Sequence, residues 1–307
     1  MIGELANQLA LAAGVLAAFA IGPGLAITFL LLRRARVKAA RRSPIGINLL
    51  RGPGHTLREQ LEEESSNIIW DLLVLAVAPL MMLALYLAQA HSRGWDQMRH
   101  LAPVYVMLAG ATVAYVVYRL VKRSERLGNL RSGYDAEVAV GQELDLLMRR
   151  GAVVFHDFPA EGFNIDHVVI TPTCVYAIET KGYTKLNKLK GRDGATVEFN
   201  GLTLRFPTWT TDEPILQAER QARWLADWIK KATGHPVRVQ PVVALPGWFV
   251  KEKGMGAVKV ISGRQLSGLL DTPEPQLDPR TQTITYQVEQ RCRTVVPTYR
   301  RDGTEKV

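Results

Sequence analysis

The stretch NIDHVVITPTCVYAIETK, residues 164–181, decides the fold that this sequence predicts. It contains two runs of β-forming residues, Val168–Ile170 and Val175–Ile178. Between them, Thr171–Thr173 has a proline at its centre and favours a turn. The stretch therefore predicts a β-hairpin.

The register of this hairpin brings charged side chains together. We expect Thr171 to pair with Cys174 across the turn. The same register places Asp166 opposite Glu179, with Cβ atoms about 4.5–5.5 Å apart. Because side chains alternate along a strand, Lys181 points to the same face as Glu179. The hairpin thus predicts two carboxylates and one ammonium group on one face of a sheet.

Two carboxylates this close repel each other unless a cation lies between them. Mg²⁺ typically binds one or two protein carboxylates and fills its remaining positions with water and phosphate oxygens. We therefore expect Asp166 and Glu179 to bind Mg²⁺ or Mn²⁺. Lys181 would orient a metal-bound water or neutralise developing negative charge. The alternative is an exposed cross-strand ion pair between Asp166 and Lys181.

A helix is predicted before the hairpin, from Tyr134 to Arg150. Ser132, followed three residues later by Asp135, is typical of a helix N-terminus, and Gly151 follows the last helical residue. Extending the apolar stripe of this helix toward its start reaches Glu137. We expect this glutamate to be either an inward-facing ligand or a side chain that snorkels at the edge of the core.

A second helix is predicted after the hairpin, from Asp212 to Gly234, with Pro214 in its first turn. Gln217 and Gln221 are one turn apart and continue the apolar stripe of this helix. Inward-facing amides need hydrogen-bond partners, which a metal-bound water or the hairpin backbone would supply. The alternative is that both are solvated near the helix start.

The region resembles the nuclease-related domain family, often abbreviated NERD, within the PD-(D/E)XK restriction-endonuclease-like group. The resemblance covers residues 133 to about 270. It rests on the order and spacing of GYDAE (133–137), NIDHVVI (164–170), IETKG (178–182), PILQAERQ (214–221) and VVALPGW (242–248). Ile165 stands where the name of the wider group expects a proline.

The resemblance implies a fold and a catalytic site. The fold class would be α/β, a restriction-endonuclease-like mixed sheet flanked by helices, in residues 133–271. The implied catalytic residues are Glu137, Asp166, Glu179, Lys181 and, as an accessory group, Gln217. The metal ligands would be Asp166, Glu179 and Glu137.

Further elements are predicted from local patterns. They are strands at Ala152–His156, Thr196–Phe199, Leu202–Phe206, Arg238–Leu245 and Ala257–Ile261, a two-residue turn at Asn200 and Gly201, a short helix at Arg264–Leu270, and a strand or short helix around Thr281–Cys292. A basic loop precedes the second hairpin and could follow a nucleic-acid backbone, or could simply be solvated. Its cations are Lys185, Lys188, Lys190 and Arg192.

The chain up to residue 121 has a different composition. Apolar runs predict an all-α transmembrane region of about three helices, with spans at about 9–32, 70–90 and 101–121. Basic residues dominate the loop 33–67 after the first run and the linker 122–132 after the third. The positive-inside rule therefore places both on the cytoplasmic side, with the domain 133–271 and the tail 272–307. A model with only two spans would place that domain on the other side.

The composition of the chain limits the compartments and the kinds of metal site that are possible. The chain has a net charge of +9 and only two cysteines, which suits a reducing compartment and excludes a four-cysteine zinc site. We expect a multi-pass protein of a bacterial inner membrane whose cytoplasmic domain is a Mg²⁺-dependent nuclease that hydrolyses DNA. The alternative is a catalytically inactive nuclease-like module that binds DNA, a protein partner or another copy of the chain.

Overall fold

The computed structural model describes residues 44–185, 191–269 and 278–297, together with residues 25, 26, 28–30, 32, 33 and 36. The chain divides into two compact units. Among the described residues, the hairpin unit contains residues 62–127 and the described residues up to 46, and the sheet unit contains residues 47–61 and 128–297 with the gaps just given. The sheet unit is thus built from two separate parts of the chain.

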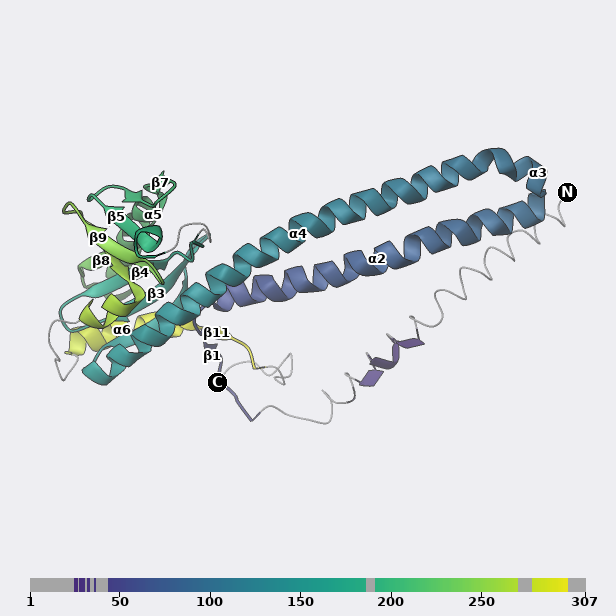
Figure 1. Cartoon of the computed structure of the whole chain (residues 1–307). Helices are drawn as coiled ribbons and strands as arrows, with labels where there is room; N and C mark the ends of the chain where they lie inside the picture. Colours follow the sequence, from purple (N-terminus) through teal and green to yellow (C-terminus); the bar gives the residue numbers. More distant parts are fainter. Residues whose placement is uncertain are drawn as a thin grey trace. The chain divides into compact units, whose positions relative to one another are not determined.

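The hairpin unit consists of two long helices that run side by side, α2 (His55–Arg93) and α4 (Ala102–Asp145) (Figure 1). The short α3 (Trp95–Met98) and the 3₁₀ turn η1 (Arg99–Leu101) connect them. Both long helices continue into the sheet unit. By length and composition alone, these two helices could each cross a membrane. The first expected span, 9–32, lies mostly outside the described residues.

Ion pairs join α2 to α4 within the hairpin unit. Asp71 lies 3.0 Å from both Arg119 and Arg123. Glu64 lies 2.7 Å from Arg123 and 3.2 Å from Arg126. Both carboxylates are buried, so these contacts supply the charge partners that a buried carboxylate requires.

The sheet unit is organised around a five-stranded mixed sheet with strand order β10-β8-β4-β3-β2. Its strands are β2 (Val153–Pro159), β3 (Asn164–Ile170), β4 (Val175–Thr180), β8 (Val239–Leu245) and β10 (Lys259–Ser262). Strands β2, β3 and β4 are antiparallel, whereas β4, β8 and β10 are parallel. The predicted hairpin and its register are confirmed, because His167 pairs with Ile178 and the Thr171 N–H donates to the Cys174 carbonyl.

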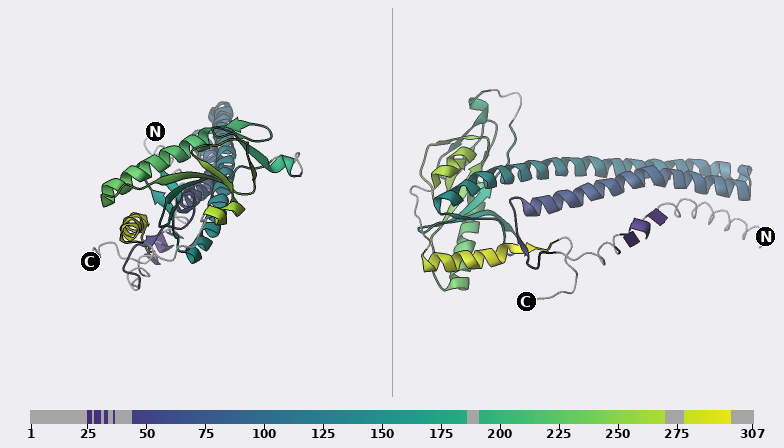
Figure 2. Two further views of the ribbon diagram at one scale, coloured as in Figure 1. Left: turned by 90° about the vertical axis from the view of Figure 1, so that its left-hand side faces the viewer. Right: turned by 90° about the horizontal axis from the view of Figure 1, so that it is seen from below.

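Helices cover both faces of this sheet (Figure 2). On one face, Val140 and Leu144 of α4 and Leu266 of the 3₁₀ helix η4 (Gly263–Leu269) pack against β3, β4 and β8. On the other face, Leu225 of α5 (Glu213–Thr233) and Val288 of α6 (Pro279–Cys292) pack against β2, β3 and β4. The predicted mixed sheet between helices is therefore confirmed.

A smaller four-stranded sheet has the order β7-β6-β5-β9. Its strands are β5 (Thr196–Phe199), β6 (Leu204–Arg205), β7 (Thr210–Thr211) and β9 (Phe249–Glu252). The hairpin between β5 and β6 was expected, but the position of its turn was wrong. The Asn200 N–H donates to the Thr203 carbonyl, so the two turn residues are Gly201 and Leu202. The Asn200 side chain accepts from the N–H groups of Leu202 and Thr203, which favours this turn.

The predicted start of the helix before the hairpin was also wrong. Residues 122–134 are part of α4, so Ser132 does not cap a helix. Its hydroxyl donates instead to the Gly182 carbonyl, at 3.0 Å. Residues Leu146–Arg150 form the 3₁₀ helix η2, which ends at Gly151 in a left-handed conformation with φ of 87°.

The chain after residue 278 contributes to the core of the sheet unit. Asp278 caps α6, because its side chain accepts a hydrogen bond from the Thr281 N–H at 2.6 Å. After α6, β11 (Arg293–Val295) pairs antiparallel with β1 (Leu49–Leu50). This pairing joins the part of the sheet unit before the hairpin helices to its final strand. The remaining short element, η3 (Asp193–Ala195), precedes β5.

Candidate catalytic site

The hairpin β3–β4 brings Asp166 and Glu179 together at one end of the central sheet. Both side chains are buried, with 6% and 3% of their surfaces exposed. Asp166 Oδ2 accepts a hydrogen bond of 2.7 Å from the Thr180 N–H of the neighbouring strand. Glu179 and Thr180 also pair with Val243 and Ala244 of β8. Asp166 is therefore held by the backbone of β4, the strand that carries Glu179.

Lys181 lies directly after β4 and contacts Glu179. Its Nζ lies 3.0 Å from Glu179 Oε1 and donates to Gln217 Oε1 at 2.9 Å. The Lys181 N–H donates to the Ala244 carbonyl, which extends the pairing of β4 with β8. The partner of Lys181 is thus Glu179, and Asp166 is held by a backbone amide.

Two glutamines of α5 face this group, as their position on the apolar stripe predicts. Gln221 Nε2 donates to Glu179 Oε2 at 2.6 Å and approaches the Asn164 carbonyl at 3.3 Å. Gln217 accepts from Lys181, as described above. Both oxygens of Glu179 therefore have a partner, one on Lys181 and one on α5.

Glu137 belongs to the part of α4 that lies in the sheet unit. Gly182 allows the end of β4 to approach this helix, because a Cβ at Gly182 would lie 2.6 Å from the Ser132 carbonyl oxygen and 2.9 Å from Ala136 Cβ. The Glu137 side chain is 6% exposed. Among the described residues, its Oε2 finds no hydrogen-bond partner. A buried carboxylate oxygen without a partner is costly unless a ligand or proton satisfies it.

The pKa values of Glu137, Asp166 and Glu179 are all raised, in each case mainly by burial. Burial raises the pKa of Glu137 to about 8, and the charges of Asp157 and Glu179 add to this effect. Burial also raises the pKa of Asp166 well above its ordinary value, as do the charges of Glu179 and Glu137. Burial raises the pKa of Glu179 as well, although Lys181 opposes the shift. A cation among these groups would stabilise their charged forms.

These residues fit a hard divalent cation. The donors are carboxylates, the unpartnered Glu137 oxygen is buried, and the charges of Glu179 and Glu137 disfavour the charged form of Asp166. No group of three or more His, Cys, Asp and Glu side chains in the described part of the chain has the arrangement of a metal site. Mg²⁺ can be bound through only one or two protein carboxylates, so a larger group is not required.

Tyr183 is a site residue that the sequence analysis missed. Burial raises its pKa, and the charges of Lys181, Glu213 and Glu179 also act on it. Its ring lies 4.8 Å from the Trp209 ring and 5.2 Å from the Phe206 ring, measured between centroids. Tyr183 lies beyond the end of β4, so alternation along the strand does not predict where its side chain points.

The basic loop is described only in part. Lys188 and Lys190 lie outside the described residues. Lys185 Nζ donates to the Gly247 carbonyl and lies 5.6 Å from the centroid of the Trp248 ring. The Arg192 guanidinium lies 5.1 Å from the centroid of the exposed Phe249 ring. The two described cations therefore lie against aromatic rings.

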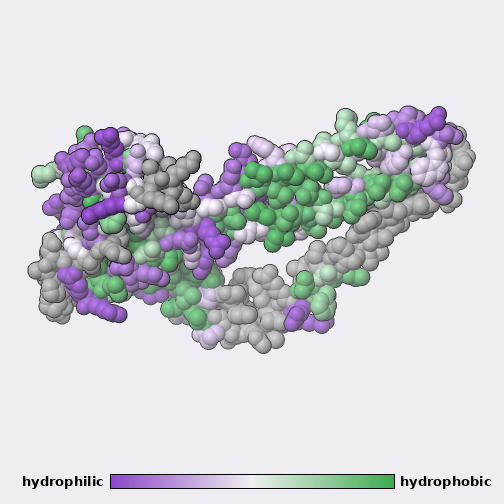
Figure 3. Space-filling view, in the orientation of Figure 1, coloured by the Kyte–Doolittle hydropathy of each residue, from purple (hydrophilic) through white to green (hydrophobic). Residues whose placement is uncertain are grey.

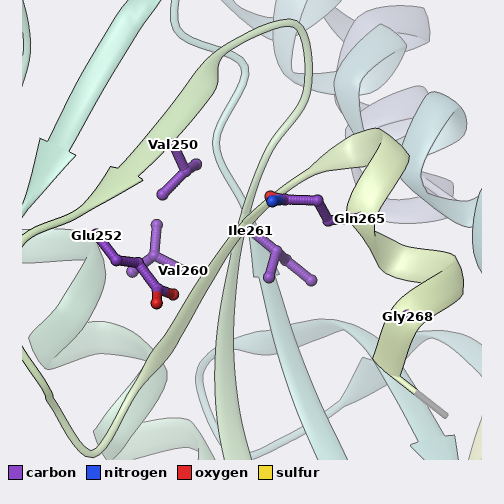
Figure 4. Close-up of a pocket in the computed structure, with 6 residues that line it drawn as sticks. All are labelled: Val250, Glu252, Val260, Ile261, Gln265 and Gly268. Atoms are coloured by element: carbon purple, nitrogen blue, oxygen red, sulfur yellow. The ribbon is translucent and has the colours of Figure 1, made fainter. Parts of the chain in front are cut away.

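A pocket of the sheet unit lies apart from these residues. It is formed by β9, β10 and η4 (Figure 4). Its lining residues are Val250, Glu252, Val260, Ile261, Gln265 and Gly268. None of the predicted site residues lines this pocket.

We expect the metal-free protein to lose stability as the pH rises. The pKa of Glu137 is raised from 4.5 to about 8 in the folded state, so the folded state binds this proton more tightly than the unfolded state. The resulting stabilisation is complete below pH 4.5 and disappears as the pH passes 8. It is on the order of 3–5 kcal/mol. Urea unfolding of the detergent-solubilised chain at pH 5 and pH 9, without divalent ions, measures it. Glu137→Gln should make the free energy of unfolding less dependent on pH. An unchanged pH dependence would contradict the attribution of this effect to Glu137.

Residues 132–246 match the family model of the nuclease-related domain, NERD. The match covers less than half of the chain. It includes Glu137, Asp166, Glu179, Lys181 and Gln217. It suggests a nuclease-like function for this part of the chain. No curated protein and no solved structure matches the chain.

Proposed function

We propose that the sheet unit is a metal-dependent nuclease of the PD-(D/E)XK type that hydrolyses phosphodiester bonds in DNA. The observation that carries the proposal is the contact network of Asp166, Glu179, Lys181 and Gln217 beside the unpartnered oxygen of Glu137. Its members come from α4, β3, β4 and α5. All of them lie within the residues that match the nuclease-related domain.

Each residue then has a distinct role. Asp166 and Glu179 would hold Mg²⁺ or Mn²⁺, and Glu137 would complete the site. When bound, the ion would supply positive charge at the phosphate and acidify a water molecule. Lys181 orients the attacking water and neutralises negative charge that develops on the phosphate. Gln217 holds Lys181 through the contact with its Oε1, and Gln221 holds Glu179. Lys185 and Arg192, with Lys188 and Lys190 of the same loop, would contact the DNA backbone.

Divalent-ion binding tests this proposal most directly. We expect Mn²⁺ and Mg²⁺ to bind the detergent-solubilised full chain, and we expect binding to disappear when Asp166→Ala and Glu179→Ala are combined, because both predicted ligands are then removed. Isothermal titration calorimetry measures the affinity. The matched control is Glu161→Ala, an exposed acid in the same unit. Wild-type protein that binds no divalent ion, with or without DNA, would contradict the proposal.

One observation favours a second candidate, a catalytically inactive module that binds DNA or a protein partner. Both Glu179 oxygens already have protein partners, so this carboxylate is satisfied without a metal. Such a module would bind DNA equally well with and without divalent ions. It would also keep that binding after both carboxylates are replaced, which separates it from the nuclease.

We also propose that the hairpin unit anchors the protein in a bacterial inner membrane. Large apolar side chains are exposed along α2 and α4, and they cluster over the middle of both helices (Figure 3). Examples are Leu72, Leu83, Met107 and Val117. The apolar part of α2, residues 72–90, would be about 28 Å long, close to the roughly 30 Å thickness of a hydrocarbon core.

The two-part sheet unit supports this topology. Residues 47–61 and residues 128–297 belong to one compact unit, so they lie on the same side of any membrane. The chain between them must therefore cross an even number of times. The two apolar helices α2 and α4 satisfy this condition. The basic loop 33–67 and the basic residues of 122–132 favour the cytoplasm for that side.

Cysteine labelling can test this topology. After both native cysteines are replaced by serine, we expect Gln97→Cys, in the exposed α3, to react with an impermeant maleimide in intact spheroplasts. Glu161→Cys, in the exposed β2–β3 turn, should react only after permeabilisation. Labelling of both positions from the same side would contradict the two crossings.

A further inference from the structure

The segment before the hairpin helices is part of the sheet unit. Residues 47–61 lie outside the residues that match the nuclease-related domain. Leu49 pairs with Val295, and the Arg51 N–H donates to the Cys292 carbonyl at 3.2 Å. The segment is therefore held by backbone hydrogen bonds at its start, before α2 begins at His55.

The next residues run along the face of α4 that carries Glu137. A Cβ at Gly54 would lie 2.7 Å from the Tyr134 ring, and a Cβ at Gly141 would lie 2.7 Å from Pro53. Tyr134 and Gly141 are three residues before and four residues after Glu137, so all three share one helix face. The Gly54 backbone also lies close enough to the Glu137 carboxyl group to lower its pKa. The segment therefore covers the helix surface on both sides of this glutamate.

A second set of contacts connects the segment to Glu179. Asp157 is fully buried and has a left-handed backbone with φ of 49°. It accepts hydrogen bonds from Arg51 at 2.6 Å, Thr56 at 2.8 Å and Asn164 at 2.6 Å. The Asn164 carbonyl in turn accepts from Gln221, which donates to Glu179. A chain of hydrogen bonds thus runs from the segment to the second predicted ligand.

We propose that residues 51–57 position the Glu137 carboxylate and, through Asp157, Asn164 and Gln221, support Glu179. The candidate catalytic site is then incomplete without a segment that lies about eighty residues upstream of the family match. The inference rests on the proposed function only in treating these carboxylates as ligands. The packing of the segment against α4 does not depend on it.

Two glycine substitutions in this segment form a matched test. Gly54 has φ of +68° and no room for a Cβ, whereas nothing lies within 4 Å of a Cβ at Gly52. We expect Gly54→Ala to displace the segment and weaken Mn²⁺ binding by the full chain at least tenfold. Gly52→Ala should change the affinity less than twofold. Neither change alters charge, so the comparison reports geometry alone.

Calorimetry separates positioning from loss of folding. A variant in which some molecules unfold binds fewer ions per chain at unchanged affinity, whereas displacement of Glu137 lowers the affinity itself. If Gly54→Ala does not fold, Thr56→Val removes the hydroxyl that donates to Asp157 and accepts from Arg51, and it should also weaken Mn²⁺ binding. Wild-type affinity in a folded Gly54→Ala variant, or in Thr56→Val, would overturn the inference.

A measurement without metal tests the same geometry. In a chain whose native cysteines are replaced by serine, the thiol introduced by Glu137→Cys should react slowly with a maleimide, because the segment covers it. Adding Gly54→Ala should speed this reaction at least tenfold, and adding Gly52→Ala should not. Equal rates in all three proteins would overturn the inference. If the wild-type protein binds no Mn²⁺, the proposed function is contradicted. The alkylation rates then still decide whether the segment covers Glu137.

Discussion

Replacing Lys181 with methionine should lower DNA cleavage by about 10²- to 10³-fold while leaving divalent-ion binding intact. Methionine preserves much of the length of the side chain but removes the ammonium group, which lies 3.0 Å from Glu179 and donates to Gln217. Without it, the negative charge that develops on the scissile phosphate loses its ammonium partner and keeps only that of the proposed metal ion. Initial rates of plasmid cleavage by the detergent-solubilised chain measure this loss.

Lys185→Met provides the control for this variant. Lys185 is the next lysine along the chain and donates to the Gly247 carbonyl, away from the carboxylates. Its loss should weaken DNA binding and leave the maximal rate within about threefold of wild type, as expected for a single contact to the backbone. Mn²⁺ affinity of Lys181→Met should equal or exceed the wild-type value, because the ammonium no longer competes for Glu179. A maximal rate unchanged by Lys181→Met would contradict the proposed role.

The largest effect on stability is expected for Phe158→Ala. Phe158 is fully buried, and its ring lies 5.1 Å from Trp228 and 6.2 Å from Trp224, measured between centroids. Removing the ring leaves a cavity between β2 and α5, and such truncations cost about 3–5 kcal/mol. Urea unfolding of the full chain, followed by tryptophan fluorescence, measures the change in free energy.

Phe163→Ala is the matched control for this substitution. The Phe163 ring also contacts Trp224, at 5.4 Å, but 39% of the residue is exposed. We expect a loss of about 1 kcal/mol or less, because more than a third of this residue stays in contact with water and its removal leaves no enclosed cavity. Equal losses for the two variants would show that burial against α5 does not determine the stability of the sheet unit.

The sequence predicted those parts of the fold whose structure depends on residues close to one another in the chain. The register of β3–β4 follows from alternation on both sides of one short turn, and the His167–Ile178 pair confirms it. The helix α5 has an amphipathic stripe, a proline in its first turn and Gly234 after its end. These signals agree with one another, so no distant contact was needed to interpret them.

Other features depend on contacts between distant residues. Ser132 and Asp135 form a plausible helix start, but the sequence before them also favours helix, and α4 continues through both. The pairing of Leu49 with Val295 leaves no periodic signal in either short strand. The contact of Arg51 with Asp157 spans 106 residues. Neither the residues around Arg51 nor those around Asp157 form a pattern that indicates the other. The contacts of residues 51–57 with the site are therefore visible only in the three-dimensional structure.

The pairing of β1 with β11 also constrains how the protein is made. Strand β1 leaves the ribosome more than 240 residues before its partner β11. During that interval the two long apolar helices α2 and α4 also emerge. Leu49, Leu50 and Arg51 therefore lack these backbone partners until residues 292–295 are synthesised. Because long-range pairing is slow and leaves edges exposed, nascent chains truncated before residue 293 should be protease-sensitive in this early segment and the complete chain protected.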